Sequence, residues 1–214
     1  MKHISTYEQF IAESLILEFG DASNPFKYKG DITEDAYFNQ MIKKAEGELR
    51  HRGGRVDQMP HKDLTYTVFG DKATYTVSFG GYVSSAVMLP GTNTLPWFIE
   101  YDVSFNVKDS VAETETNFGE QYRLMATVTQ ICLDFIKAAA DAGISIRTLG
   151  MFPKNDAGSD SVSIASRRGR LYLEYVKKNI KKLSGNWTAE LASDGIILHS
   201  GTWSGAGKEW IYNK

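Results

Sequence analysis

The chain has 214 residues, of which 42% are apolar, so its length and composition suit one domain with a sizeable core and short appendages. The single cysteine, Cys132, excludes an intrachain disulfide, and a net charge of −2 gives no overall attraction to nucleic acid or to a membrane surface. No apolar run is long enough to cross a bilayer, so we expect no membrane-spanning segment.

A short amphipathic helix is predicted at residues 1–18. Ser5 and Glu8 have the spacing of a capping box, in which each side chain accepts a hydrogen bond from a backbone amide at the helix start. Phe10, Ile11 and Leu15 give the segment an apolar stripe. Residues 19–31 are rich in glycine, asparagine and proline, which predicts a linker to a single domain over residues 32–214.

The sequence of residues 7–13, YEQFIAE, resembles the head-targeting leader of the internal proteins of large T-even-type tailed phages. In that family the leader carries a protein into the assembling prohead, and a maturation protease cuts after Glu in a Leu/Ile-x-Glu tripeptide. Residues 11–13 and 16–18 match the tripeptide, so the resemblance implies cleavage after Glu13 or Glu18. It also implies prohead components and the maturation protease as partners, and a location in the virion head and then in the host cytoplasm. An ordinary helix that docks on the domain through Phe10 and Ile11 is the alternative interpretation.

The first half of the domain is predicted to combine one helix with antiparallel strands. Thr33 begins the helix, an apolar face recurs along it every three or four residues, and Gly53 and Gly54 end it. Alternation with a period of two then predicts a hairpin over residues 64–79 with its turn at residues 70–72. An edge strand with a loop is expected over residues 80–94, and a long strand with one apolar face over residues 97–107.

The second half is predicted to add two helices and further strands. The helices are expected at residues 121–140 and 166–183, on either side of a strand at residues 144–152. Short strands follow near residues 187–191 and 195–200, with a further strand within residues 203–212. Cys132 lies on the apolar stripe of the first helix, which indicates a buried hydrophobe and not a nucleophile. The pattern predicts an α+β fold with a mostly antiparallel sheet and flanking helices.

Charge is unevenly distributed along the domain. The stretch from Glu100 to Glu120 is acidic, and the stretch from Arg167 to Lys182 is basic. The two stretches either face each other within the fold or face different partners, such as DNA or a host protein. The residues that we single out as candidate nucleic-acid or partner contacts are Arg167, Arg168, Arg170, Lys177, Lys178 and Lys181.

The common signatures of catalytic and metal sites are absent from the sequence. There is no phosphate-binding loop, dinucleotide fingerprint or nucleophile elbow, and the histidines have no metal-ligand spacing, so neither a metal nor a cofactor is expected. Glu100 and Asp102 share one face of the strand at residues 97–107, where two carboxylates can bind a metal or act as acid and base. A solvated strand face is the alternative interpretation of this pair.

A long strand, a helix, a strand, a loop and a helix containing the sequence RLY at residues 170–172 resemble the C-terminal half of the GNAT acyltransferases. In that family a glycine-rich segment before the first of these helices holds a pyrophosphate with backbone amides. The corresponding residues 117–123 contain one glycine, Gly119. The resemblance of residues 7–13 to the head-targeting leader implies a phage accessory protein that is packaged in the head and acts by binding a host or virion component. A small GNAT-like acyltransferase and a structural head or neck component are the alternatives.

Overall fold

The computed structural model describes residues 24–51, 59–60, 63–85, 97–108, 120–151, 172–192, 195–204 and 209–212. Residues 172–180 are helical, and the other elements are β1 (Lys27–Gly30), α2 (Glu34–His51), β2 (Met59–Pro60), β3 (Leu64–Phe69), β4 (Thr74–Ser85), β5 (Trp97–Val107), α3 (Gln121–Asp141), β6 (Ser145–Met151), β7 (Thr188–Leu191), β8 (Ile196–His199), β9 (Gly201–Ser204) and β10 (Glu209–Tyr212).

The main sheet has the strand order β1-β3-β4-β5-β6-β8-β7, and the short strand β2 also pairs with β4. Its neighbouring strands are antiparallel, with the exception of β5 and β6, which run parallel and are connected by α3. Strands β9 and β10 form a separate antiparallel pair. The predicted fold class, α+β with a mostly antiparallel sheet and flanking helices, is confirmed.

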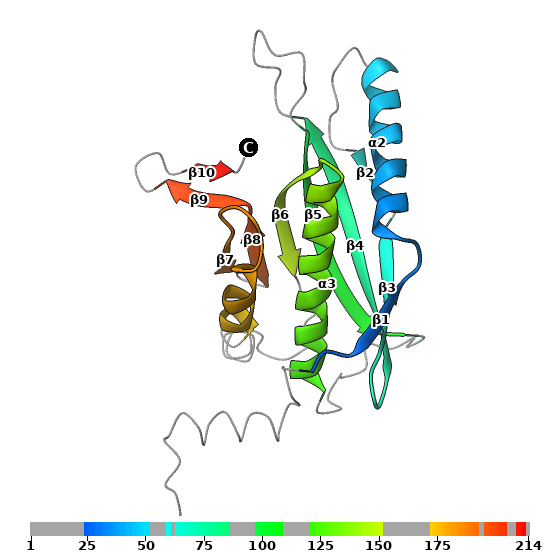
Figure 1. Cartoon of the computed structure of the whole chain (residues 1–214), viewed down its shortest axis with the longest axis vertical. Helices are drawn as coiled ribbons and strands as arrows, with labels where there is room; N and C mark the ends of the chain where they lie inside the picture. Colours follow the sequence, from blue (N-terminus) through cyan, green and yellow to red (C-terminus); the bar gives the residue numbers. More distant parts are fainter. Residues whose placement is uncertain are drawn as a thin grey trace, which may run out of the picture.

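The helices cover one face of the sheet, where the core lies (Figure 1). Helices α2 and α3 contact each other through Phe38 and Phe135, whose ring centroids are 5.1 Å apart. The ring of Phe135 also lies 4.3 Å from that of Phe79 on β4, so one α3 side chain joins both helices to the sheet. The helix at residues 172–180 contributes Tyr172 and Val176 to the same core. Burial of this aromatic and aliphatic surface is the main favourable contribution to folding.

The predicted helices and strands agree with much of this architecture. The hairpin over residues 64–79 is formed by β3 and β4, and the long strand is β5. Helix α3 buries the predicted stripe, which consists of Leu124, Val128, Ile131, Cys132, Phe135 and Ile136. The predicted helix at residues 166–183 is described from residue 172 onward, and residues 166–171 lie outside the described part of the chain.

The linker predicted over residues 19–31 is wrong for its described part, residues 24–31. Strand β1 pairs with β3 over Lys27–Gly30, and the side chain of Phe26 is 3% exposed in the core. The strand is only four residues long, so its alternation is too short to outweigh the neighbouring glycine and proline signals. Residues 1–23, including the helix predicted at residues 1–18, lie outside the described residues.

The edge strand predicted from residue 80 is also wrong for its described part, residues 80–85. Strand β4 continues through Gly80 and Gly81 to Ser85 and pairs with β5 from Tyr75 to Ser85, and β2 pairs with Tyr82 and Val83 on the other side. Packing explains why residue 81 is glycine, because a Cβ atom at this position would lie 2.4 Å from a ring carbon of Tyr101. Gly81 therefore allows a large side chain of β5 to lie over β4, and it does not mark a strand end.

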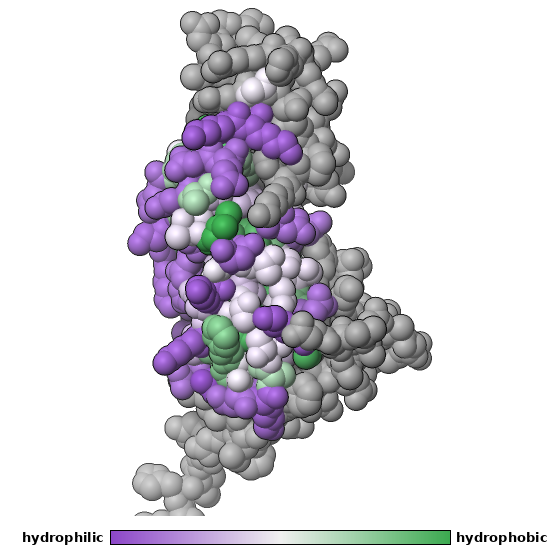
Figure 2. Space-filling model, turned by 90° about the vertical axis from the view of Figure 1, so that its right-hand side faces the viewer, coloured by the Kyte–Doolittle hydropathy of each residue, from purple (hydrophilic) through white to green (hydrophobic). Residues whose placement is uncertain are grey.

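The surface next to β1 and α2 is mostly hydrophilic, with small separate hydrophobic spots (Figure 2). Among the described residues, the large hydrophobic side chains that are exposed are Phe69 at 51% and Leu191 at 38%. Lys27 and Lys29 are exposed on the edge strand β1, where charged side chains discourage pairing with another strand. None of the described helices is long and apolar enough to cross a membrane.

Candidate functional site

The carboxyl ends of the parallel strands β5 and β6 indicate where a ligand site of this domain is expected. Ligands of sheets with parallel strands commonly bind outside the carboxyl ends of those strands. Helix α3 begins after the carboxyl end of β5, and the helix at residues 172–180 follows that of β6. Tyr122 and Tyr172, from the first described turns of these helices, have ring centroids 6.0 Å apart in an edge-to-face arrangement. We therefore take this end as the candidate site.

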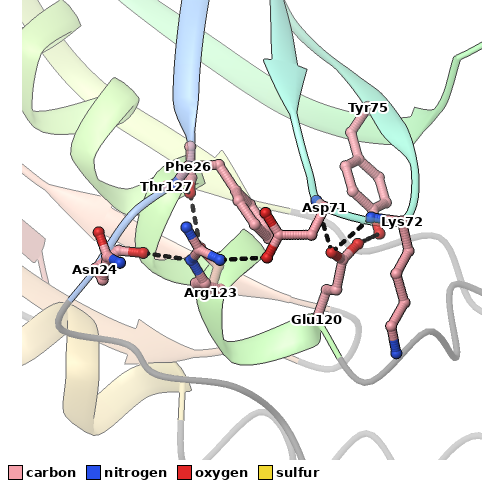
Figure 3. Close-up of polar contacts among 8 residues, drawn as sticks. All are labelled: Asn24, Phe26, Asp71, Lys72, Tyr75, Glu120, Arg123 and Thr127. Carbon is pink, nitrogen blue, oxygen red and sulfur yellow. Dashed lines mark hydrogen bonds and ion pairs between the residues drawn. The ribbon is translucent and has the colours of Figure 1, made fainter.

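A buried carboxylate lies immediately before α3. Glu120 is 6% exposed, and its Oε1 atom accepts hydrogen bonds from the backbone amides of Asp71 at 2.8 Å and Lys72 at 3.0 Å. Its Oε2 atom accepts a hydrogen bond of 2.7 Å from the hydroxyl of Tyr75. Figure 3 shows the carboxylate pointing into the turn between β3 and β4. The negative charge thus receives three donors from the hairpin, which offset the loss of hydration on burial.

Gly70 permits this close approach. A Cβ atom at this position would lie 2.5 Å from the carbonyl oxygen of Ala73, 2.8 Å from a ring carbon of Tyr75 and 3.1 Å from Oε2 of Glu120. The first neighbour belongs to the turn, the second to β4, and the third is the carboxylate that the turn binds. Any larger residue would have to displace the turn from the start of α3.

Arg123, one turn further along α3, connects the same turn to the chain before β1 (Figure 3). Its Nη1 atom donates a hydrogen bond of 2.6 Å to Oδ2 of Asp71, and its Nε atom donates one of 2.6 Å to the carbonyl oxygen of Asn24. The guanidinium carbon lies 4.1 Å from the ring centroid of Phe26, close enough for a cation–π interaction. The backbone amide of Phe26 in turn donates to Oγ1 of Thr127 at 2.8 Å.

These contacts indicate a structural role for the polar groups at this end of the domain. Both oxygens of Glu120 and two donor groups of Arg123 are directed at the protein's own chain. Burial, together with the hydrogen bond to Glu120, raises the pKa of Tyr75 above its ordinary value, so Tyr75 stays a hydrogen-bond donor at neutral pH. The cluster fixes the β3–β4 turn and the start of β1 onto α3.

Glu100 and Asp102 lie on β5, away from this cluster, on the sheet face opposite the buried Tyr101 and Val103. The register of β5 with β6 shifts between Ile99 and Glu100. Asp102 is exposed, and its register partners on the neighbouring strands are both glycines, Gly80 and Gly150. Among the described residues, no group of three or more His, Cys, Asp or Glu side chains could hold a metal ion.

The predicted basic contacts divide between described and undescribed parts of the chain. Lys177, Lys178 and Lys181 are exposed, whereas Arg167, Arg168 and Arg170 lie outside the described residues, as do Glu13 and Glu18. The amine of Lys177 lies 3.2 Å from a carboxylate oxygen of Glu174, one turn earlier. Both side chains of this ion pair are largely exposed, so it contributes little to stability.

Sequence reasoning missed two polar contacts that the fold assembles. Glu120 appeared only as part of an acidic stretch, because its donors lie more than 40 residues away. His199 on β8 is buried, and its Nε2 atom lies 3.1 Å from Oε1 of Glu190 on β7. The contacts of Glu120 depend on how the β3–β4 hairpin packs on α3, and that of His199 depends on the pairing of β7 with β8.

The chain thus forms an α+β domain in which a helix connects two parallel strands. Beside the carboxyl ends of these strands lies a cluster of polar side chains that hydrogen-bond to the protein itself. No protein-family model matches the chain, and searches among curated proteins and solved structures give no significant match.

Proposed function

We propose that the chain is an accessory protein of a tailed phage that is carried into the head by residues 1–18, and that its folded domain acts by binding a host or virion component. The observation that carries the packaging part is the leader-like sequence at residues 7–13, with Leu/Ile-x-Glu tripeptides that end at Glu13 and Glu18. These residues lie outside the described part of the chain, so the support comes from the sequence.

The surroundings of Glu120 favour a binding role over group transfer from a phosphate-bearing cofactor. A helix N-terminus attracts anions because its first amides and the helix dipole present positive charge. Here a buried carboxylate directly precedes α3 and is bonded to the β3–β4 turn. A pyrophosphate at the same position would lie beside this negative charge, which disfavours its binding.

Processing of the leader tests the packaging proposal. In infected cells that supply the prohead protease, the chain should lose residues 1–13 or 1–18, which mass spectrometry of purified particles would detect as a new N-terminus. The double variant Glu13→Gln and Glu18→Gln should stay uncut. Glu8→Gln is the matched control, because it removes the same charge outside both tripeptides and glutamine still suits a capping box. Packaged protein that keeps its first residues would refute the leader proposal.

The fate of the packaged chain separates an internal protein from a structural component. An internal protein should leave the particle with the DNA when osmotic shock empties the head, whereas a head or neck component should stay in the shell. Quantitative mass spectrometry of the two fractions measures this partition. Retention in the emptied shell would favour the structural alternative.

A docking helix is the other alternative for residues 1–18. Removal of a helix that packs on the core should lower the melting temperature by at least about 2–4 °C, which corresponds to roughly 1 kcal/mol for a domain of this size. We expect a smaller change, because the described core includes Phe38, Phe79 and Phe135 and is continuous without these residues. Calorimetry of the truncated and full chains decides between the two interpretations.

An acyltransferase is the second candidate function, and the order of elements favours it. The support is the order of strand β5, helix α3, strand β6 and the helix at residues 172–180, which are the elements from which the resemblance to GNAT acyltransferases is drawn. In such an enzyme Glu100 or Asp102, beside the register shift of β5, would be placed to act as a general base.

Coenzyme A binding tests this second candidate. Isothermal titration calorimetry with acetyl-coenzyme A should show saturable binding if the domain is a transferase, and Glu100→Gln or Asp102→Asn should then lower turnover without abolishing binding. The absence of heat at a millimolar ligand concentration would remove the acyltransferase candidate. That outcome would leave the packaging proposal untouched, because the leader is tested separately.

A further inference from the structure

The helix at residues 172–180 and the turn after it present two chemically distinct sides. Tyr172, Val176 and Ile180 are buried in the core, so the element is held firmly on the sheet. The exposed lysines occupy the opposite side, and we call them the lysine face: Lys177, Lys178, Lys181 and Lys182. At a helical rise of about 1.5 Å per residue, the nine helical residues span about 13 Å, and Lys181 and Lys182 lie in the turn beyond them.

The charges of the lysine face are poorly balanced within the described chain. Between residues 172 and 183 the sequence contains one carboxylate, Glu174, and this group lies beside Lys177. The amine of Lys182 donates to the side chain of Asn179 at 2.9 Å, which is a neutral partner. Lys177 and Lys178 lie in the helix and Lys181 and Lys182 in the turn after it, so four like charges lie within six residues of the chain and repel one another.

Attraction of cations to the helix C-terminus favours this arrangement but does not neutralise it. The helix C-terminus carries roughly half a negative charge, which favours lysine in and just after the last turn. Lys177 and Lys178 lie in the last turn of the helix and Lys181 and Lys182 in the turn that follows, so four positive charges share this half charge. An external polyanion would relieve the repulsion of all four groups at once.

The composition of the face suits the backbone of duplex DNA. Duplex DNA carries one negative charge per about 1.7 Å of axis, so several phosphates lie within reach of one helix of this length. Lysine acts as a flexible point charge and contacts phosphate without reading bases. Binding of single strands relies on exposed aromatic side chains, and the helix's tyrosines, Tyr172 and Tyr175, are buried and partly buried.

We propose that the lysine face is a sequence-independent contact surface for the phosphate backbone of duplex DNA. This inference deepens the proposed function by naming the virion component, and it rests on that function only for its biological setting. Because the chain has a net charge of −2, the attraction is local and should be strongest at low salt.

The test uses the purified full chain and a fluorescent duplex of mixed sequence, with binding measured by anisotropy between about 50 and 200 mM monovalent salt. Three or four phosphate contacts give a slope of log affinity against log salt of about −2.7 to −3.6, a loss of roughly 40- to 150-fold over this range. The triple variant Lys178→Gln, Lys181→Gln and Lys182→Gln keeps the Lys177–Glu174 pair and should bring the slope to about −1.

The control changes net charge equally at another place. Lys29, Lys43 and Lys137 are exposed on β1, α2 and α3, and their joint replacement by glutamine should leave the salt slope within experimental error. Thermal unfolding of both triple variants checks that each is folded at the temperature of measurement. An equal loss of affinity in the control variant would overturn the proposal, because the attraction would then be a property of overall charge.

Two further outcomes would also overturn the proposal. The first is no binding of the parent chain to the duplex at about 50 mM salt. The second is competition by poly-glutamate as effective as that by unlabelled duplex of the same charge, which would indicate an acidic protein surface as the partner. Both measurements use purified components, so their failure is distinguishable from a failure of leader processing in particles.

Discussion

The hydroxyl of Tyr75 donates a hydrogen bond of 2.7 Å to the carboxylate of Glu120, 45 residues further along the chain. Tyr75 is the second residue of β4 and is fully buried, whereas Glu120 precedes α3. The same carboxylate also accepts from the amides of Asp71 and Lys72, so the bond joins the β3–β4 turn to the helix that connects the parallel strands. A charged acceptor with three donors in a dry environment forms a strong link between distant parts of the chain.

Replacement of Glu120 by glutamine should lower the free energy of unfolding by about 1–3 kcal/mol, because one charged acceptor oxygen becomes an amide donor facing a hydroxyl. Urea denaturation of Glu120→Gln, Tyr75→Phe and the double variant measures this loss and the coupling between the residues. We expect a coupling of about 0.5–3 kcal/mol, typical of directly bonded groups. Glu174→Gln is the control, since that carboxylate is in an exposed pair and should change stability by less than about 1 kcal/mol. Additive effects of the two substitutions would contradict the prediction.

Gly70 and Gly47 should respond in opposite ways to alanine. At Gly70 the added Cβ would overlap a backbone carbonyl oxygen of the turn at 2.5 Å, so Gly70→Ala should destabilise the domain by about 1–3 kcal/mol. At Gly47, inside α2, a Cβ meets nothing within 4 Å, and Gly47→Ala should stabilise by about 0.5–1 kcal/mol through helix propensity. Thermal unfolding of the two variants measures the direction of each change in stability. A stabilising effect of Gly70→Ala would show that the turn shifts freely.

The elements that sequence reasoning predicts well are those with a long periodic signal. The stripe of α3 extends over more than three turns, and β5 alternates over its 11 residues, so both are recognisable without tertiary information. Strand β1 has only four residues and its sequence predicts a linker, because its position depends on pairing with β3. The glycines of β4 likewise predict a strand end, because the packing of Tyr101 that explains Gly81 has no local sequence signal.

The candidate site is harder to predict from the sequence than the fold is. The exposed lysines at Lys177, Lys178 and Lys181 are visible in the sequence, because a charged helix face is a local pattern. The hydrogen bonds of Glu120 are not visible in the sequence, because they depend on the antiparallel register of β3 with β4 and on the position of α3. Contacts between distant segments lack any pattern that a single sequence reveals.

The buried tyrosines predict a loss of stability at alkaline pH. Burial is the largest cause that raises the pKa values of Tyr66, Tyr75 and Tyr101 above the ordinary value of about 10. A group whose pKa is higher in the folded state stabilises the fold fully below its unfolded pKa, and this contribution is lost as pH rises through and beyond about 10. Urea denaturation between about pH 8 and 11 should therefore show decreasing stability, and Tyr101→Phe should reduce the slope.

Ultraviolet absorbance of tyrosinate provides an independent check of the same prediction. The buried tyrosines should ionise together with the loss of circular dichroism, and not separately from it. Ionisation of all tyrosines near pH 10 with the fold intact would contradict the burial of Tyr66, Tyr75 and Tyr101 (ordinary pKa about 10).

Cys132 should be unreactive toward thiol reagents while the domain is folded. The residue is 1% exposed on the core side of α3, and burial raises the pKa of its thiol above the ordinary value, so both access and the thiolate fraction are reduced. A colorimetric disulfide reagent should modify the folded chain only as fast as the domain opens, and the unfolded chain in urea at the rate of a free thiol. The reference is a Cys132→Ala chain that also carries Ser184→Cys, because residue 184 is exposed in the turn after the helix. Equally fast modification of Cys132 and of this exposed reference in the folded state would mean that α3 does not bury its predicted stripe.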